Sequence, residues 1–298
     1  MTHVDTGAVW APLVIGRPTD PFPARGPSAG PYRPDMIADG WSSDHFAVRC
    51  ASVRGASHRY LGEPRQDECA VVPHPSGAVI AVVADGVSGA PLSHLGATMV
   101  CRTVVDYLSR VLDDGTELDW PDLMRCAGWS LAEYAARQLG ADEPDPQEAE
   151  RLLATTVVVA YVRPDGPGRA LGWLARVGDS TAWTLRGTRW TPLFPAVGPH
   201  SELLPDSVYA LPRVPTAIVP VEVELAVGDV LVLGTDGFAD PLGDGTGTVG
   251  ELFATNLAHP PALPGLAWLL DFSWETHDDD RTVLAVWPAV AATPTIEP

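Results

Sequence analysis

The chain has 298 residues, and 46% of them are hydrophobic, which is enough to bury a substantial core in a single domain. Its formal net charge is −19 with only 19 Lys and Arg residues, so nucleic acid and anionic membrane surfaces would be repelled and are not expected partners. No stretch approaches the roughly 20 apolar residues of a membrane span, and the opening MTHVDTGAVW lacks the features of a signal peptide. We therefore expect a cytoplasmic protein.

The two ends of the chain differ in composition from the middle. Residues 1–40 are dense in Pro and Gly and show neither a helical nor a strand period, and the closing residues 289–298 are similar. Each end is expected to be either a disordered tail or a strap, docked on a partner or across the domain surface. Residues 41–288 are expected to form the domain itself.

The first half of the domain contains strands followed by helices. Apolar, β-branched runs predict strands at 45–52, 68–73 and 78–84, and the last of these is typical of a strand buried on both faces. Apolar residues at helical spacing then predict helices at 93–112 and 120–139. A polar, acidic break follows at about 140–150.

The second half returns to strands and ends with short helices and one more strand. The hairpin turn Arg186-Gly187-Thr188 connects two of these strands. In chain order the predicted elements are strands at 155–163, 170–177, 180–186, 189–194, 217–225 and 229–235, helices at 248–258 and 263–271, and a strand at 282–287.

Strands in blocks and helices in pairs predict an α+β fold. We expect a layered α-β-β-α sandwich, in which two antiparallel sheets are flanked by helix pairs. A parallel nucleotide-binding fold is disfavoured, because no GxGxxG or Walker A stretch follows any predicted strand.

Cysteine usage indicates the redox compartment. Cys50, Cys69, Cys101 and Cys126 form no CxxC pair and lie within apolar segments. We expect buried free thiols in a reducing compartment.

Four acidic turns stand at the ends of apolar stretches. They are Gln66-Asp67, Asp85-Gly86, Asp236-Gly237 and the run Asp278-Asp279-Asp280. A carboxylate just past a buried strand is held rigidly, and several such groups brought together form an all-oxygen site suited to Mg²⁺ or Mn²⁺. Glycine after Asp85 and Asp236 is expected to let the backbone turn sharply.

The ordered set QDECAVV, AVVADGVSG, ATTVVVAYV, ARVGDSTAW, DVLVLGTDGF and DDDRTVLAV resembles the metal-dependent protein phosphatases of the PP2C type over about residues 45–288. The resemblance implies hydrolysis of phosphoserine or phosphothreonine on a protein, opposite a Ser/Thr kinase, by a water activated between two Mn²⁺ or Mg²⁺ ions.

The resemblance also implies the metal ligands. Asp67 and Asp85 would make bridging or water-mediated contacts, the Gly86 carbonyl would be a direct ligand, and Asp236 and Asp279 would complete the site. The register between Asp279 and Asp280 stays open, with Asp280 as a ligand or as an orienting group.

Three positions depart from the family pattern. Where many members carry a phosphate-binding Arg, this chain has His58, so His58, Arg54, Arg59 or Arg65 would contact the phosphate and His58 with Asp67 would act in catalysis. The structural alternative for His58 is a turn cap or a bond to a carbonyl. Val87 replaces a His that is a general acid in some members, and the Asp of a third metal site is missing, although Glu150 lies next to that position.

The remaining acidic turns are expected to be structural. Asp179 in the Gly178-Asp179-Ser180 turn shapes a strand pair, and Asp240, Asp244 and the GDGTG stretch fail the spacing of a Ca²⁺ loop and predict a surface flap.

Because of the departures, two other functions stay open. One is a catalytically weak, phosphatase-like regulator that binds a phosphoprotein, and the other is a small-molecule phosphohydrolase.

Overall fold

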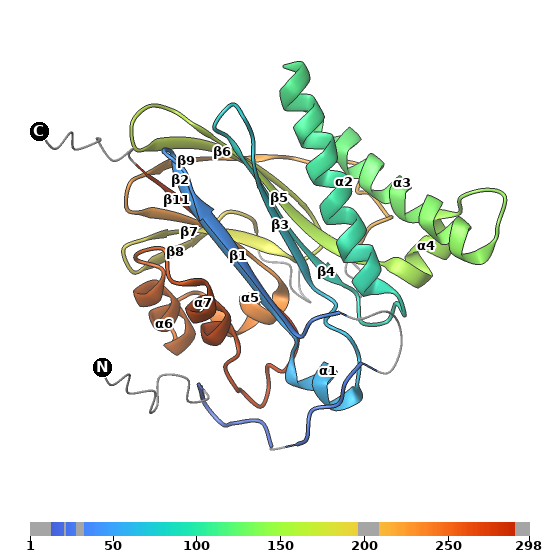
Figure 1. The fold of residues 1–298 in the computed structure, drawn as a ribbon, viewed down its shortest axis with the longest axis horizontal. Coiled ribbons are helices and arrows are strands. Elements are labelled where there is room, and N and C mark those ends of the chain that lie inside the picture. Colours follow the sequence, from blue (N-terminus) through green and yellow to red (C-terminus); the bar gives the residue numbers. More distant parts are fainter. Residues whose placement is uncertain (1–12, 21, 28–32, 196–208, 290–298) are drawn as a thin grey trace, which may run out of the picture.

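The computed structural model describes residues 13–20, 22–27, 33–195 and 209–289. Two antiparallel sheets pack face to face, and helices cover the outer face of each sheet (Figure 1). The predicted α-β-β-α sandwich is therefore confirmed. No helix among these residues is long and apolar enough to cross a membrane.

The first sheet has six strands and draws on both ends of the domain. Its order is β1 (Met36–Ser42), β2 (Phe46–Val53), β11 (Arg281–Pro288), β10 (Asp229–Gly234), β7 (Thr181–Arg186) and β8 (Arg189–Pro192). Strand β11 pairs with both β2 and β10, so the last strand of the domain joins its beginning to its middle.

The second sheet has five strands and a simpler order. It runs β3 (Glu68–Pro73), β4 (Val79–Gly86), β5 (Thr155–Pro164), β6 (Arg169–Val177) and β9 (Val221–Ala226). Strand β4 is buried on both faces along nearly its whole length, as its continuous apolar run predicts. The long connection from β4 to β5 contains the helices of this side, α2 (Ser93–Asp114), α3 (Trp120–Leu139) and α4 (Pro146–Leu153).

Three apolar layers hold the sandwich together. The middle layer lies between the sheets and includes Val83 and Leu284. One outer layer packs α2, α3 and α4 on the second sheet, and the other packs α5 (Asp236–Leu242), α6 (Thr248–Asn256) and α7 (Leu263–Leu270) on the first. The strands between these layers are rigid supports for the turns at their ends.

Four elements were not predicted, each for a local reason. Strand β1 begins inside the segment expected to be a tail, and it is an edge strand that pairs only with β2. Helix α1 (Ala56–Leu61) is only six residues long. Helix α5 contains a proline. Helix α4 lies in the segment that was expected to be an acidic break. Asp145 caps its first turn by accepting from the Gln147 amide, and an aspartate followed by proline is a recognisable start of a helix.

Other differences are smaller. Strand β9 begins at Val221 and not at residue 217. All four cysteines are free, but only Cys50 and Cys101 are buried, whereas Cys69 and Cys126 are half-buried.

The described residues of the N-terminal segment, 13–20 and 22–27, lie against the domain, and we call them the strap. The Ile15 amide donates to the Ser273 carbonyl at 3.0 Å, and the Arg25 amide donates to the Arg59 carbonyl at 2.9 Å. The Ile15 side chain is buried, and the Phe22 ring meets Tyr60 edge-on with centroids 5.6 Å apart. These contacts place the strap beside α1 and the segment that precedes β11.

Helix α2 approaches the end of α4 closely at Gly96. A Cβ atom on Gly96 would lie 2.0 Å from the Leu153 carbonyl oxygen at the end of α4. Leu153 directly precedes the Ala154-Thr155 step into β5, so this contact fixes α2 against the strand that pairs with β4.

Gly96→Ala is therefore expected to lower the free energy of unfolding by about 1–3 kcal/mol, because backbone would have to move to admit the methyl group. Gly265→Ala is a matched control in helix α7, where an added Cβ meets nothing within 4 Å. Urea denaturation of both variants checks the difference, and equal stability of the two would contradict the close packing.

Candidate metal centre

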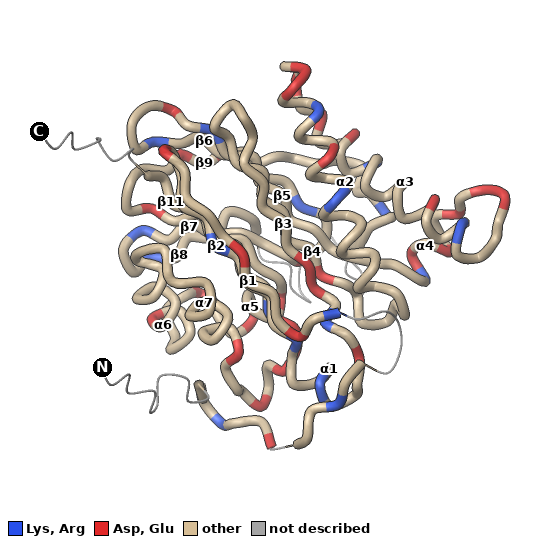
Figure 2. Tube along the Cα trace, viewed as in Figure 1, with Lys and Arg blue, Asp and Glu red and all other residues tan. Residues whose placement is uncertain are grey.

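Four aspartates from separate parts of the chain meet at one end of the sandwich. Asp67 precedes β3, Asp85 lies at the end of β4, Asp236 begins α5, and Asp279 precedes β11. Figure 2 shows acidic positions in red at the lower ends of the central strands, near α1. The structure thus brings together residues that are up to 212 positions apart, from 67 to 279.

The members of this carboxylate cluster influence one another electrostatically. Burial, followed by the charges of the neighbouring carboxylates, raises the pKa of Asp67 and of Asp85 well above the ordinary value. Burial also raises the pKa of Asp236 to about 6, although a hydrogen bond with Asp85 lowers it. The pKa of Asp279 is raised as well, first by burial and then by Asp280. Anionic groups held this close repel one another unless a cation joins them.

Asp67 is oriented by hydroxyl groups and arginines around it. Its Oδ2 atom accepts from Thr235 Oγ1 at 2.8 Å and from Thr282 Oγ1 at 2.7 Å. Its backbone carbonyl accepts from Arg33 Nη2 at 2.7 Å and from Arg65 Nη1. These contacts fix both the backbone and the side chain of Asp67. The two threonines that donate to its carboxylate are visible in the sequence, because Thr235 directly precedes Asp236 and Thr282 follows Arg281.

Two glycines of the acidic turns are explained by close packing. A Cβ on Gly237 would lie 1.9 Å from the Asp280 carbonyl, and one on Gly86 would lie 2.8 Å from Ser93. Neither glycine has a positive φ, so the expected sharp turn is not the reason for them. Glycine is required here because neighbouring backbone segments must approach closely.

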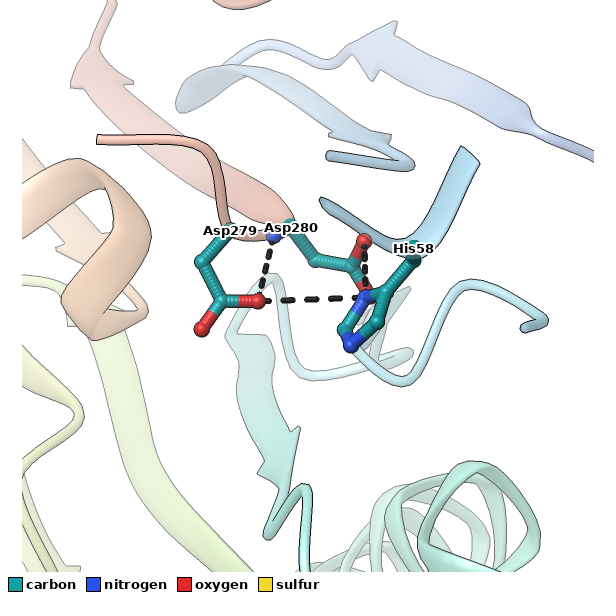
Figure 3. A group of neighbouring side chains, drawn as sticks. All are labelled: His58, Asp279 and Asp280. Atoms are coloured by element: carbon teal, nitrogen blue, oxygen red, sulfur yellow. Dashed lines mark hydrogen bonds and ion pairs between the residues drawn. The ribbon is translucent and has the colours of Figure 1, made fainter. Parts of the chain in front are cut away.

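Asp280 is buried and surrounded by donors. Its Oδ1 accepts from the Gly55 amide at 2.6 Å and its Oδ2 from the Gln66 amide at 2.5 Å. His58 Nδ1 lies 2.9 Å from Oδ1, and Figure 3 shows the two side chains facing each other. Burial favours neutral His58, but the hydrogen bond and charge of Asp280, together with Asp279, outweigh burial and raise the pKa of His58 to about 9. At neutral pH His58 is therefore a cation paired with Asp280.

Two groups of side chains offer ligand atoms for a metal ion. The ligand atoms of His58, Asp279 and Asp280 lie within 4.8 Å of one another. A protonated imidazole is not a ligand, however, and both Asp280 oxygens already accept hydrogen bonds. Asp67, Asp85, Asp236 and Asp279 offer the carboxylate oxygens that hard divalent cations prefer, although among the described residues their oxygens do not form a group as compact as that of His58, Asp279 and Asp280.

The arginines expected to bind phosphate have other partners. Arg54 is 1% exposed, lies 3.0 Å from Asp35 and donates to the Arg25 carbonyl at 2.5 Å. Arg59 donates to Asp271 at 2.8 Å. Arg65 is buried beneath Asp67. Each of these guanidinium groups therefore has an acceptor within the protein, and its contact with a substrate phosphate stays a prediction.

The other departures from the family pattern also have structural explanations. Val87 packs against a small apolar group formed by Ala90, Ala154 and Ala210. Glu150 pairs with Arg213, so its carboxylate is already engaged.

Two further carboxylates lie nearer the cluster than the sequence indicates. Burial raises the pKa of Asp179, and the charge of Asp240 adds to this effect. Both residues also act on the pKa of Asp236. Asp179 Oδ1 is buried without a hydrogen-bond partner among the described residues. No spacing in the sequence indicates this proximity, because it depends on how β6 and α5 end.

Comparison with known proteins places this fold and site in a family. The family described as Protein phosphatase 2C matches residues 54–262. No curated protein sequence matches the chain.

Solved structures share the fold at low sequence identity. The catalytic domain of the serine/threonine phosphatase PstP in complex with two manganese ions is 18% identical, with a TM-score of 0.54 over 82% of this chain and 99% of that one. The serine/threonine phosphatase PstP/Ppp of Mycobacterium tuberculosis is 17% identical, with a TM-score of 0.53 over 82% and 99%. RsbX in complex with magnesium is 11% identical, with a TM-score of 0.54 over 85% and 100%.

At sequence identities below 20%, these solved structures show the fold alone. The family model matches residues 54–262, which is most of the domain, and it shows the family. The chain belongs to the protein phosphatase 2C family of serine/threonine phosphatases.

Proposed function

We propose that the protein hydrolyses phosphoserine and phosphothreonine on a protein substrate, using two Mn²⁺ or Mg²⁺ ions held by the carboxylate cluster. The observation that carries the proposal is the convergence of Asp67, Asp85, Asp236 and Asp279. Burial raises the pKa of all four, and the charges of other members of the cluster raise it further for Asp67, Asp85 and Asp236. The related PstP domain was solved with two manganese ions, which supports the same number here.

In this proposal Asp67, Asp85, Asp236, Asp279 and the Gly86 carbonyl hold the ions. When bound, such ions lower the pKa of a coordinated water and stabilise the charge that develops on a phosphoryl group. Thr235 and Thr282 keep the Asp67 carboxylate in position.

Asp280 and His58 are assigned to positioning. The Asp280 carboxylate accepts from the Gly55 and Gln66 amides. These two hydrogen bonds connect the turn before β11 to the start of α1 and to the residue before Asp67. His58 supplies the compensating charge. A direct role of His58 in proton transfer stays a prediction, and its 4% exposure favours the positioning role.

Mn²⁺-dependent turnover of a phosphothreonine peptide tests this function. The expected result is hydrolysis that needs Mn²⁺ or Mg²⁺ and stops with a chelator. Binding of the phosphopeptide without turnover would favour the regulator, and a strong preference for nucleotides or sugar phosphates would favour the small-molecule phosphohydrolase.

Asp236→Asn is expected to lower turnover at least about 100-fold, since residues that only support metal ligands already cost 10–100-fold when changed. The variant should fold, because it removes one of several repelling charges. Calorimetric titration with Mn²⁺ should show weakened binding. Asp244→Asn, at an exposed turn, is the control, and wild-type activity of Asp236→Asn would refute the ligand assignment.

The stability of the metal-free protein should depend on pH in a defined direction. Because the pKa of Asp236 rises from 3.8 to about 6, the folded protein binds a proton more tightly than the unfolded chain. For this group, the free energy of unfolding should therefore be highest below about pH 4 and fall by about 3 kcal/mol as the pH rises through 6.

Urea denaturation in EDTA across this window measures the slope, and Mn²⁺ at pH 7 should restore the lost stability. In the Asp236→Asn variant the slope should be smaller. A stability of the metal-free wild type that increases over the same window would contradict the clustering of the carboxylates.

His58→Ala is expected to reduce the free energy of unfolding by about 3 kcal/mol, because it leaves the buried Asp280 carboxylate without its cation. Turnover should fall less than in Asp236→Asn, and Mn²⁺ binding should persist. Chemical denaturation and the peptide assay check both points. Unchanged stability would show that the pair with Asp280 contributes nothing.

A further inference from the structure

The three residues directly before β1 are bonded to the chain around the metal centre. They are Arg33, Pro34 and Asp35. The Arg65 Nε atom donates to the Pro34 carbonyl at 3.4 Å, and the Arg54 amide donates to the Asp35 carbonyl at 2.7 Å. Because Arg54 follows β2 and Arg65 precedes β3, these contacts tie the chain before β1 to both ends of the segment that connects the two strands.

The Arg33 side chain contacts the backbone of a proposed metal ligand. Its Nη2 atom donates to the Asp67 carbonyl at 2.7 Å and lies 3.2 Å from Glu68 Oε2. Its Nη1 atom donates to Thr98 Oγ1 of helix α2 at 2.9 Å, and Thr98 Oγ1 is itself 3.1 Å from the same Glu68 oxygen. The Arg33 side chain is 11% exposed. One nearly buried guanidinium therefore joins the Asp67 backbone to α2.

Arg65 donates to the same carbonyl but is anchored elsewhere. Its Nη1 atom also donates to Ser52 Oγ of β2 at 2.6 Å. Ser52 Oγ lies 2.6 Å from Thr282 Oγ1 of β11, which bonds to the Asp67 carboxylate. Arg65 thus connects Asp67 to the first sheet, whereas Arg33 connects it to the helix that covers the second. Without Arg33, the Asp67 carbonyl would keep only the contact on the side of the first sheet.

The charge of Arg33 does not explain its position. A cation beside the carboxylate cluster repels a divalent metal ion, so its charge alone would weaken metal binding. Glu68 lies close enough to Arg33 to offset that charge. What the guanidinium contributes is geometry, since its planar fork places two nitrogens on two fixed acceptors at once.

We propose that Arg33 is a positioning residue for the metal centre. By holding the Asp67 carbonyl against Thr98, it fixes the place of the Asp67 carboxylate and so raises the affinity for Mn²⁺ or Mg²⁺. The proposal rests on the proposed function, because it takes Asp67 as a metal ligand. It also gives a role to the chain that precedes the region matched by the family model, residues 54–262.

Calorimetric titration of the full-length, metal-free protein with Mn²⁺ tests the proposal without any assay of turnover. Arg33→Gln removes the fork and should weaken Mn²⁺ binding by about 10-fold or more, the usual cost of losing a group that orients a metal ligand. Arg33→Lys keeps the charge but not the planar fork, so its affinity for Mn²⁺ should lie between those of Arg33→Gln and the wild type.

Arg25→Gln is the matched control. It removes the same charge from the same part of the chain, but the Arg25 guanidinium lies over the Tyr60 ring, 5.3 Å from its centroid, and contacts no proposed ligand. Its Mn²⁺ affinity should equal that of the wild type. Thr98→Val removes the acceptor of Arg33 Nη1 and should also weaken Mn²⁺ binding. In the double variant with Arg33→Gln it should add little, because the two changes break one contact.

Each possible result decides the proposal. Unchanged or tighter Mn²⁺ binding by Arg33→Gln would overturn it, and so would an equal loss in Arg25→Gln, which would trace the effect to a loosened N-terminal segment. If urea denaturation in EDTA shows that Arg33→Gln does not fold, Arg33→Lys decides alone, and wild-type affinity in that variant would overturn the proposal. Failure of the wild type to bind Mn²⁺ would refute the metal centre together with this proposal, whereas equal binding by wild type and variants would refute this proposal alone.

Discussion

The mutual repulsion of buried carboxylates is the constraint on which the rest of the structure depends. Four aspartates with raised pKa values gather at the ends of strands that are themselves sealed between apolar layers. Such a cluster opposes folding unless the surrounding backbone is rigid and a cation can be bound. The sandwich supplies the rigidity. Hydrogen bonds from Thr235 and Thr282 hold the Asp67 carboxylate, and two arginines hold its carbonyl.

The Asp280 carboxylate links the metal centre to the rest of the domain. It accepts from the Gly55 and Gln66 amides, and its charge is compensated by His58. Gly55 cannot be larger, because a Cβ there would lie 2.2 Å from the Asp279 backbone.

The sequence was sufficient for the fold class and for the central strands, because the apolar run of β4 and the helical spacing of α2 and α3 are strong local signals. It also indicated that acidic turns at strand ends would meet. It did not indicate contacts between separate segments: Arg54 pairs with Asp35 and donates to the Arg25 carbonyl, and the charge of Asp179 raises the pKa of Asp236. The buried His58–Asp280 pair could likewise not be predicted from the sequence, since it depends on how α1 packs on the turn before β11.

Anomalous scattering from crystals soaked in Mn²⁺ tests the central claim most directly, because it locates the ions without any assay of activity. The account predicts two manganese peaks among Asp67, Asp85, Asp236 and Asp279, with His58 and Asp280 still paired beside them. A single peak between His58, Asp279 and Asp280, or no peak near the four carboxylates, would contradict it.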